Sequence, residues 1–249
     1  MPVLLITMST TTPTTTKAEA LSEGQLYRAL TWFSPGFPIG AFSYSHSLET
    51  VAASGGVRDR DTLQRWIAAI LAQGTGRIDA DTLREAYRAA STADAEALTA
   101  ANRRGLAFRG TAEMALETTA QGAAFLSVCR AAWPEPFLDR WAARLEETGE
   151  AVCLSAAVGA TTARAGIPLE QALIGYLHAM AANLVSAGLR LSIVGQTDGQ
   201  RILAALEQVV GDAAASALTR GPCAFGGAAL AVDLASMAHE IQYTRLYRT

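Results

Sequence analysis

Apolar residues recur at helical spacing along nearly the whole chain. One window shows this clearly, with large apolar side chains at Leu63, Trp66, Ile67, Ile70 and Leu71. Such spacing places a single apolar stripe on a helix. No alternating run of β-branched residues indicates a strand, and no repeat of 20–50 residues is present. The pattern predicts an all-α fold: a single-domain helical bundle of about ten helices over residues 22–249.

Helix breakers and caps divide this pattern into elements. Ser22 and Gln25 have the spacing of a capping box, which predicts the start of a first helix. Pro168 is expected as the first residue of a later helix, and Thr197 is expected to cap the next one. The other predicted elements are helices at residues 44–54, 59–74, 80–90, 111–131, 137–147, 150–165, 168–190, 197–218 and 228–239, with a further start at Ser91 or Asp94.

The first 21 residues differ from the rest in composition. A Ser/Thr/Pro tract fills residues 9–16, and the short apolar run before it lacks the cationic leader of a secretory signal. Such a composition buries too little apolar surface to offset the entropy of ordering. Residues 1–21 are therefore predicted to form a disordered tail.

Residues 172–188 raise the question of a membrane span, because they contain no Asp, Glu, Lys or Arg. The stretch is at the short limit for crossing a bilayer. It contains His178 and Asn183, and it is flanked by Glu170 and Arg190. These polar residues favour a central core helix over a membrane helix, which would require detergent for solubility.

Charge and cysteine content narrow the function classes. The formal net charge of 249 residues is −3, and the densest basic spot, Arg103-Arg104 followed by Arg109, fits a solvated helix end. Nucleic acid is therefore not expected as a partner. The three cysteines are expected to be small buried residues, as suits a reducing cytosol: Cys129, Cys153 and Cys223.

No motif for catalysis or metal binding is recognised. The three histidines are scattered, with His178 expected in the core and His46 and His239 expected at the surface. Glu113 and Glu117 are one helical turn apart, but with no partnering histidine in view they are assigned to a solvated face. The segment 195–201 lacks the lysine of a phosphate loop. No enzyme activity, metal or cofactor is predicted.

Two segments have the composition of contact surfaces. In residues 34–44, two prolines and two glycines exclude a regular helix, yet Phe37, Ile39 and Phe42 are interleaved with them. A stiff apolar loop must pack on its own core or on a partner. At the other end of the chain, aromatic and Arg residues of the kind enriched at interfaces alternate. The predicted partner-binding residues are Phe37, Ile39, Phe42, Tyr44, Tyr243, Arg245, Leu246, Tyr247 and Arg248. The alternative for the C-terminal tail is docking on its own body.

Three blocks of the sequence resemble the UreF family of urease accessory proteins. They are Ser-Pro-Gly-Phe-Pro-Ile-Gly-Ala-Phe-Ser-Tyr-Ser at residues 34–45, Asn-Leu-Val-Ser-Ala-Gly-Leu-Arg-Leu at 183–191 with Gly-Gln-Thr-Asp-Gly-Gln-Arg at 195–201, and His-Glu-x-x-Tyr-x-Arg-Leu at 239–246. Their order in an Ala-rich helical chain of this length makes the resemblance specific. It covers about residues 22–249.

The resemblance implies a non-catalytic, dimeric scaffold in the cytoplasm. Members of the family bind the accessory protein UreD, also called UreH, and the GTPase UreG, and the assembly delivers nickel to apo-urease. Modulation of GTP hydrolysis is also implied. By motif, Tyr44 and Arg245 are the residues whose segments rearrange when UreD/UreH binds, creating the surface that recruits UreG. No role is carried over to residues 113–122, which match only loosely.

A second hypothesis belongs to another class of protein. An all-α enzyme or small-ligand carrier would use a pocket on the helix 168–190, lined by Tyr176 and His178. It predicts that the purified protein converts a substrate or retains a ligand.

Overall fold

A computed structural model describes residues 20–249, and the predicted disordered tail at 1–21 lies almost entirely outside them. The described part is helical without strands, which confirms the all-α prediction. Its elements are α1 (Glu23–Trp32), η1 (Ala41–Ser43), α2 (Leu48–Ala53), α3 (Arg60–Gln73), α4 (Thr75–Ser91), α5 (Ala95–Ala107), α6 (Ala112–Ala132), α7 (Pro136–Thr148), α8 (Leu154–Arg164), α9 (Leu169–Arg190), α10 (Gln196–Thr219), η2 (Pro222–Ala224) and α11 (Leu230–Glu240).

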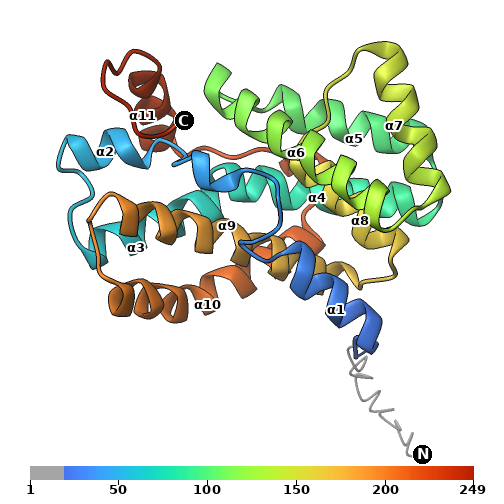
Figure 1. Cartoon of the computed structure of the whole chain (residues 1–249), viewed down its shortest axis with the longest axis horizontal. Coiled ribbons are helices and arrows are strands. Elements are labelled where there is room, and N and C mark those ends of the chain that lie inside the picture. Colours follow the sequence, from blue (N-terminus) through green and yellow to red (C-terminus); the bar gives the residue numbers. More distant parts are fainter. Residues whose placement is uncertain (1–19) are drawn as a thin grey trace, which may run out of the picture.

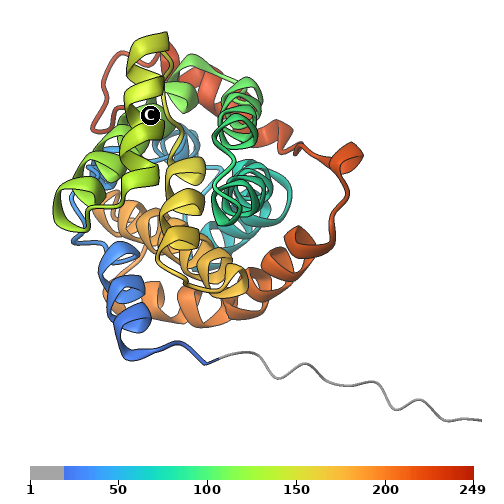
Figure 2. The same ribbon diagram turned by 90° about the vertical axis from the view of Figure 1, so that its right-hand side faces the viewer.

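The helix α4 is the centre of the bundle. It packs against α3, α5, α8, α9 and α10, and most of its residues are buried. Figure 1 shows α11 and the C-terminus at one end of the molecule, next to α2 and far from α1. Viewed at right angles, the chain between α10 and α11 runs along the outside of the bundle (Figure 2). Of the N-terminal elements, α2 thus lies beside α11, whereas α1 lies on a different part of the molecule (Figure 1).

The helix α4 begins five residues earlier than predicted. Gly74 and Gly76 predict a loop. In the structure Gly74 is the N-cap of α4, and Gly76 lies inside the first turn of that helix. A Cβ on Gly76 would stand 2.6 Å from the Cα of Leu71. Glycine is therefore needed here for the sharp turn that folds α4 back along α3, and it does not end a helix.

Several smaller expectations are corrected by the structure. Pro168 is the N-cap of α9 and not its first residue, and α10 begins at Gln196 after an extended Gly195, so Thr197 lies within the helix and caps nothing. The helix expected at residues 44–54 is shortened to α2, because His46 and Ser47 adopt positive φ angles just before it. The Ser22–Gln25 capping box is present as predicted.

Two helices, α9 and α10, are long and apolar enough to cross a membrane by length and composition alone. Such helices also occur in the cores of soluble proteins. Half of the apolar window of α9 is buried in the bundle, and α9 packs against α3, α4, α8 and α10. This agrees with a packed helix for residues 168–190, although its His178 is exposed and is not the core histidine that was expected.

Close helix packing at the centre depends on glycine. In α8, a Cβ placed on Gly159 would stand 2.5 Å from the carbonyl oxygen of Leu83 in α4. That oxygen belongs to a helix backbone and has little freedom to move. The contact between α4 and α8 is thus set by the absence of a side chain at this position.

We expect Gly159→Ala to lower the free energy of unfolding by about 1–3 kcal/mol, because the added methyl group overpacks this contact. The matched control is Gly211→Ala in α10, where a Cβ would meet nothing within 4 Å. It should raise stability by up to about 1 kcal/mol through helix propensity. Urea unfolding of both variants checks this, and equal effects would contradict it.

The cysteines differ in accessibility. Cys129 and Cys153 are buried as predicted, but Cys223 is exposed, because the segment around η2 runs over the surface. Burial raises the pKa of Cys129 to about 12 and also raises the pKa of Cys153.

A thiol reagent at pH 8 should therefore modify one cysteine per native chain, Cys223, because the two buried thiols remain protonated and covered. All three should react in denaturant. Mass measurement of the labelled protein checks the count, and rapid labelling of Cys129 in the folded chain would contradict it.

Candidate functional site

The apolar loop at residues 33–44 is only partly exposed to solvent. Phe37 is buried, with its ring centroid 5.2 Å from that of Phe125 in α6. Ile39 is half-buried against the core, whereas Phe42 is 70% exposed. Gly40, in a left-handed conformation (φ 72°), turns the chain between them. The loop thus packs on its own core through one aromatic side chain and presents another to solvent.

The end of this loop pairs with the last residues of the chain. The backbone N–H of Ser45 donates to the carbonyl oxygen of Thr249 (2.9 Å), and its hydroxyl donates to the same oxygen (2.6 Å). The N–H of Arg248 donates to the carbonyl oxygen of Ser43 (2.9 Å). Tyr44 is buried between these contacts. The two segments singled out in the sequence are thus brought together.

Arg190, at the end of α9, also connects the two segments. Its guanidinium donates to the carbonyl oxygen of Phe42 and lies 4.8 Å from the ring centroid of Tyr247. The hydroxyl of Tyr247 donates to the carbonyl oxygen of Ala187 (3.3 Å). Tyr247 is buried, and burial raises the pKa of its hydroxyl.

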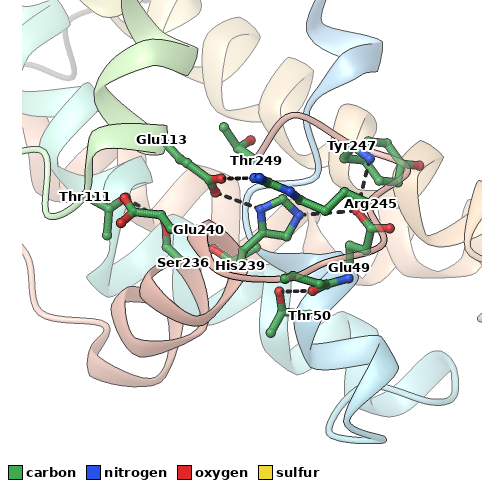
Figure 3. Close-up of polar contacts among 12 residues, drawn as sticks. Glu49, Thr50, Thr111, Glu113, Ser236, His239, Glu240, Arg245, Tyr247 and Thr249 are labelled. Atoms are coloured by element: carbon green, nitrogen blue, oxygen red, sulfur yellow. Dashed lines mark hydrogen bonds and ion pairs between the residues drawn. The ribbon is translucent and has the colours of Figure 1, made fainter.

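Two carboxylates hold the C-terminal tail, defined here as residues 241–249 (Figure 3). Glu49 in α2 accepts the backbone N–H groups of Leu246 (2.7 Å) and Tyr247 (3.0 Å), one on each oxygen. Glu113 in α6 accepts from the guanidinium of Arg245 (2.7 Å). Both carboxylates are buried. Of the two alternatives left open for the tail, the structure shows docking on its own body.

His239 of α11 lies between the same two carboxylates (Figure 3). Its Nδ1 is 2.7 Å from Glu113 and its Nε2 is 3.3 Å from Glu49. The residue has no exposed surface, so the expectation of an exposed His239 was wrong, as was that of a solvated Glu113. Both residues are buried because α2, α6 and α11, which are far apart in the sequence, converge here.

A second histidine–carboxylate pair lies beside the first. Glu117 contacts Nδ1 of His46 (3.2 Å) and accepts from the hydroxyl of Thr249 (2.9 Å). Nε2 of His46 is 2.7 Å from the hydroxyl of Thr75 at the start of α4. His46 is buried, contrary to expectation. We call the set Glu49, Glu113, Glu117, His46 and His239 the carboxylate–histidine cluster.

The predicted partner-binding residues fall into two groups. Buried residues fix the loop and the tail to the body: Phe37, Tyr44 and Tyr247, with Ile39 half-buried. Exposed residues are available for contact: Phe42, Tyr243, Arg245, Leu246 and Arg248. The carboxylate–histidine cluster that holds the tail was not predicted from the sequence. The only available signal was the helical spacing of Glu113 and Glu117, since their partners are 71 to 132 positions away.

A cavity of about 300 Å³ lies between the loop 33–44, α6 and α9. Its walls are mostly apolar, and Asp79, Arg109 and Tyr176 form a polar part of its lining. Asp79 pairs with Arg109 and accepts from the Tyr176 hydroxyl (2.9 Å). Burial, followed by the charge of Asp79, raises the pKa of Tyr176 well above its usual value. His178 does not line the cavity.

Within residues 20–249, no group of three or more His, Cys, Asp or Glu side chains is placed to hold a metal ion. In the carboxylate–histidine cluster, the two nitrogens of His239 face different carboxylates, so they do not converge on one point. Fold and site together define an all-helical protein whose buried charges dock its own C-terminal segment.

Comparison with known proteins identifies the family. The UreF family model matches residues 57–207. A urease accessory protein UreF of Rhodopseudomonas palustris (strain BisB18) is 46% identical over 233 residues, covering 92% of this chain and 95% of the relative. UreF proteins of Granulibacter bethesdensis and Bradyrhizobium sp. (strain ORS 278) are 44% and 45% identical, covering 91% and 90% of this chain and 95% and 92% of the relatives. The chain belongs to the UreF family of urease accessory proteins, which are maturation chaperones and not enzymes.

The buried ion pair of Asp79 and Arg109 beside the cavity gives a test of what stabilises the core. We expect Asp79→Ala to lower the free energy of unfolding by about 3–5 kcal/mol, because it leaves Arg109 as an uncompensated buried charge. Asp61→Ala, which removes the exposed partner of Arg60, should leave the urea midpoint close to that of the wild type. Similar shifts in the two variants would contradict this interpretation.

Proposed function

We propose that this protein acts as a non-catalytic scaffold that binds UreD/UreH and recruits the GTPase UreG, so that nickel reaches apo-urease. The docked tail and α11 form the contact surface. One observation carries the proposal: α11 is oriented with its large apolar side chains toward solvent.

The buried face of α11 carries no large apolar side chain. It consists of Val232, Ala235, Ser236 and His239. The outward face carries side chains that are each at least half exposed: Leu230, Leu234, Met237 and Ile241. An ordinary surface helix shows the reverse arrangement. Clustered exposed apolar side chains of this kind mark interaction sites.

The tail extends this surface. Tyr243 is fully exposed and Leu246 is 67% exposed, while Arg245 keeps part of its guanidinium in solvent. Leu230, Leu234 and Met237 of α11, continued by Ile241 at its C-cap, recur at intervals of three and four. This is the spacing by which a helix binds a groove in its partner. UreD/UreH is the partner that we assign to this surface.

Recruitment of UreG follows from a joint rearrangement of the tail and the loop. Ser45 and Thr249 are hydrogen-bonded, so displacement of the tail also frees the segment around Tyr44. Arg245 is held by one ion pair to Glu113 and is released with the tail. We further propose that the protein is a cytoplasmic homodimer and that its complex modulates GTP hydrolysis by UreG.

The test is co-expression of the chain with UreD/UreH and UreG, followed by affinity purification. Arg245→Ala or deletion of residues 243–249 should lower recovery of both partners about tenfold or more, because part of the contact surface is lost. The bundle should stay folded, since the tail is peripheral to the core around α4.

Arg201→Ala is the matched control. Arg201 is also an exposed arginine paired with one acidic residue, Asp198, but it lies on α10. It should leave partner recovery unchanged. Full recovery of both partners with the truncated chain, checked for helix content by circular dichroism, would refute the proposal.

The cavity favours a second candidate function, that of a small-ligand carrier. It contains Tyr176 as expected for that hypothesis, although His178 faces away from it. Native mass spectrometry of the purified protein tests this: a bound molecule would support the carrier, and a ligand-free mass would count against it.

A further inference from the structure

We propose that His239 is a positioning residue for the C-terminal tail, and that it acts as an imidazolium cation held between Glu49 and Glu113. The inference deepens the function proposed above, because it concerns how the same surface is fixed. Only the biological meaning of this inference rests on the proposed function. The geometry and the test concern this chain alone.

The hydrogen-bond contacts of the imidazole ring favour the protonated form. A neutral ring has one N–H donor and one acceptor nitrogen, whereas the protonated ring has two donors. Here Nδ1 is 2.7 Å from Oε2 of Glu113 and Nε2 is 3.3 Å from Oε2 of Glu49. A neutral ring would direct a nitrogen lone pair at a carboxylate oxygen. The protonated ring donates to both carboxylates.

Glu49 has the hydrogen-bond contacts of an ionised carboxylate. Each of its oxygens already accepts one backbone N–H of the tail, from Leu246 and Tyr247. That arrangement suits an ionised carboxylate, which accepts hydrogen bonds and donates none. A proton placed between Glu49 and His239 is therefore best located on the ring.

The charges around the ring also favour the imidazolium. Two buried carboxylates, Glu49 and Glu113, meet one partly exposed arginine, Arg245. A charged His239 makes two cations against two anions. A neutral ring would leave one anion uncompensated in a buried site, which is strongly unfavourable. The neighbouring Glu117 makes its contacts with His46 and the Thr249 hydroxyl and not with His239.

The remaining polar groups around the ring are already engaged. Glu240, the next residue of α11, accepts from the backbone N–H of Ala112. Ser236, one turn earlier in α11, is hydrogen-bonded to Thr111 (2.7 Å). The ion pairs of the ring are thus with Glu49 and Glu113, and Arg245 shares Glu113 with it. The ring connects the helix that carries the tail to both carboxylates that bind it.

The direct test is nitrogen NMR of the full chain labelled at histidine. Both ring nitrogens of His239 should carry protons that exchange slowly with water, and His178, which is exposed, serves as the reference in the same sample. A spectrum showing one unprotonated ring nitrogen at His239 would overturn the proposal, and it requires no variant to fold.

The second test is amide hydrogen exchange at Leu246 and Tyr247, whose N–H groups report the two bonds to Glu49. His239→Gln should speed this exchange about tenfold or more, because one donor and the positive charge are lost. His178→Gln should have no effect. Core amides of α4 should stay protected in both variants, which separates tail release from unfolding. Unchanged exchange at Leu246 and Tyr247 in His239→Gln would also overturn the proposal. Since no partner protein is present, failure here is distinct from failure of the partner-binding test.

Discussion

Burial of two carboxylates, Glu49 and Glu113, is the constraint on which the C-terminal part of this structure depends. An ionised carboxylate away from water requires cations and N–H donors close to it. Here the donors come from the tail and from α11: two backbone amides, the Arg245 guanidinium and the His239 ring. The acids lie on α2 and α6, which belong to the body. The tail is therefore held by electrostatic pairing and main-chain hydrogen bonds, with Tyr247 as its one buried large apolar side chain.

The same requirement operates at the centre of the bundle. Asp81 in α4 is fully buried and pairs with Arg84 and Arg220. The Arg84 guanidinium also donates to the carbonyl oxygens of Ala217 and Arg220, near the end of α10. A buried cation there satisfies carbonyl groups that have no partner within the helix. The charges of α4 thus fix where α10 ends, and with it the path of the chain toward α11.

The sequence was sufficient for the fold class and for most helices, because apolar periodicity and caps are local signals. The Ser22–Gln25 capping box is an example that needed no tertiary information. The start of α4 was missed because Gly76 serves a close approach between helices, which a sequence cannot distinguish from a loop. The burial of α4 was not predicted either. Its charged residues Asp79, Asp81 and Arg84 are typical of a solvated face until their partners are known.

The candidate site was predictable only in part, for the same reason. Composition singled out the two segments that pair in the structure, including the exposed aromatic residues Phe42 and Tyr243. It placed Glu113 and His239 at the surface, because each looks unpartnered when only nearby residues are considered. The pairs join positions 126 to 198 residues apart, a distance over which periodicity and capping rules carry no information.

The orientation of α11 links the electrostatics to the function. A helix usually buries its apolar face because that lowers the free energy of the isolated chain. In α11 the polar His239 and Ser236 face inward, since the acids of α2 and α6 must be neutralised there. The apolar residues Leu234 and Met237 are consequently left outside, where the chain alone gains nothing from them. That cost is offset only when another surface covers them. The charges that dock the tail therefore also keep the apolar face of α11 exposed for the partner contact proposed above, whereas a purely apolar docking of the same helix would have buried that face.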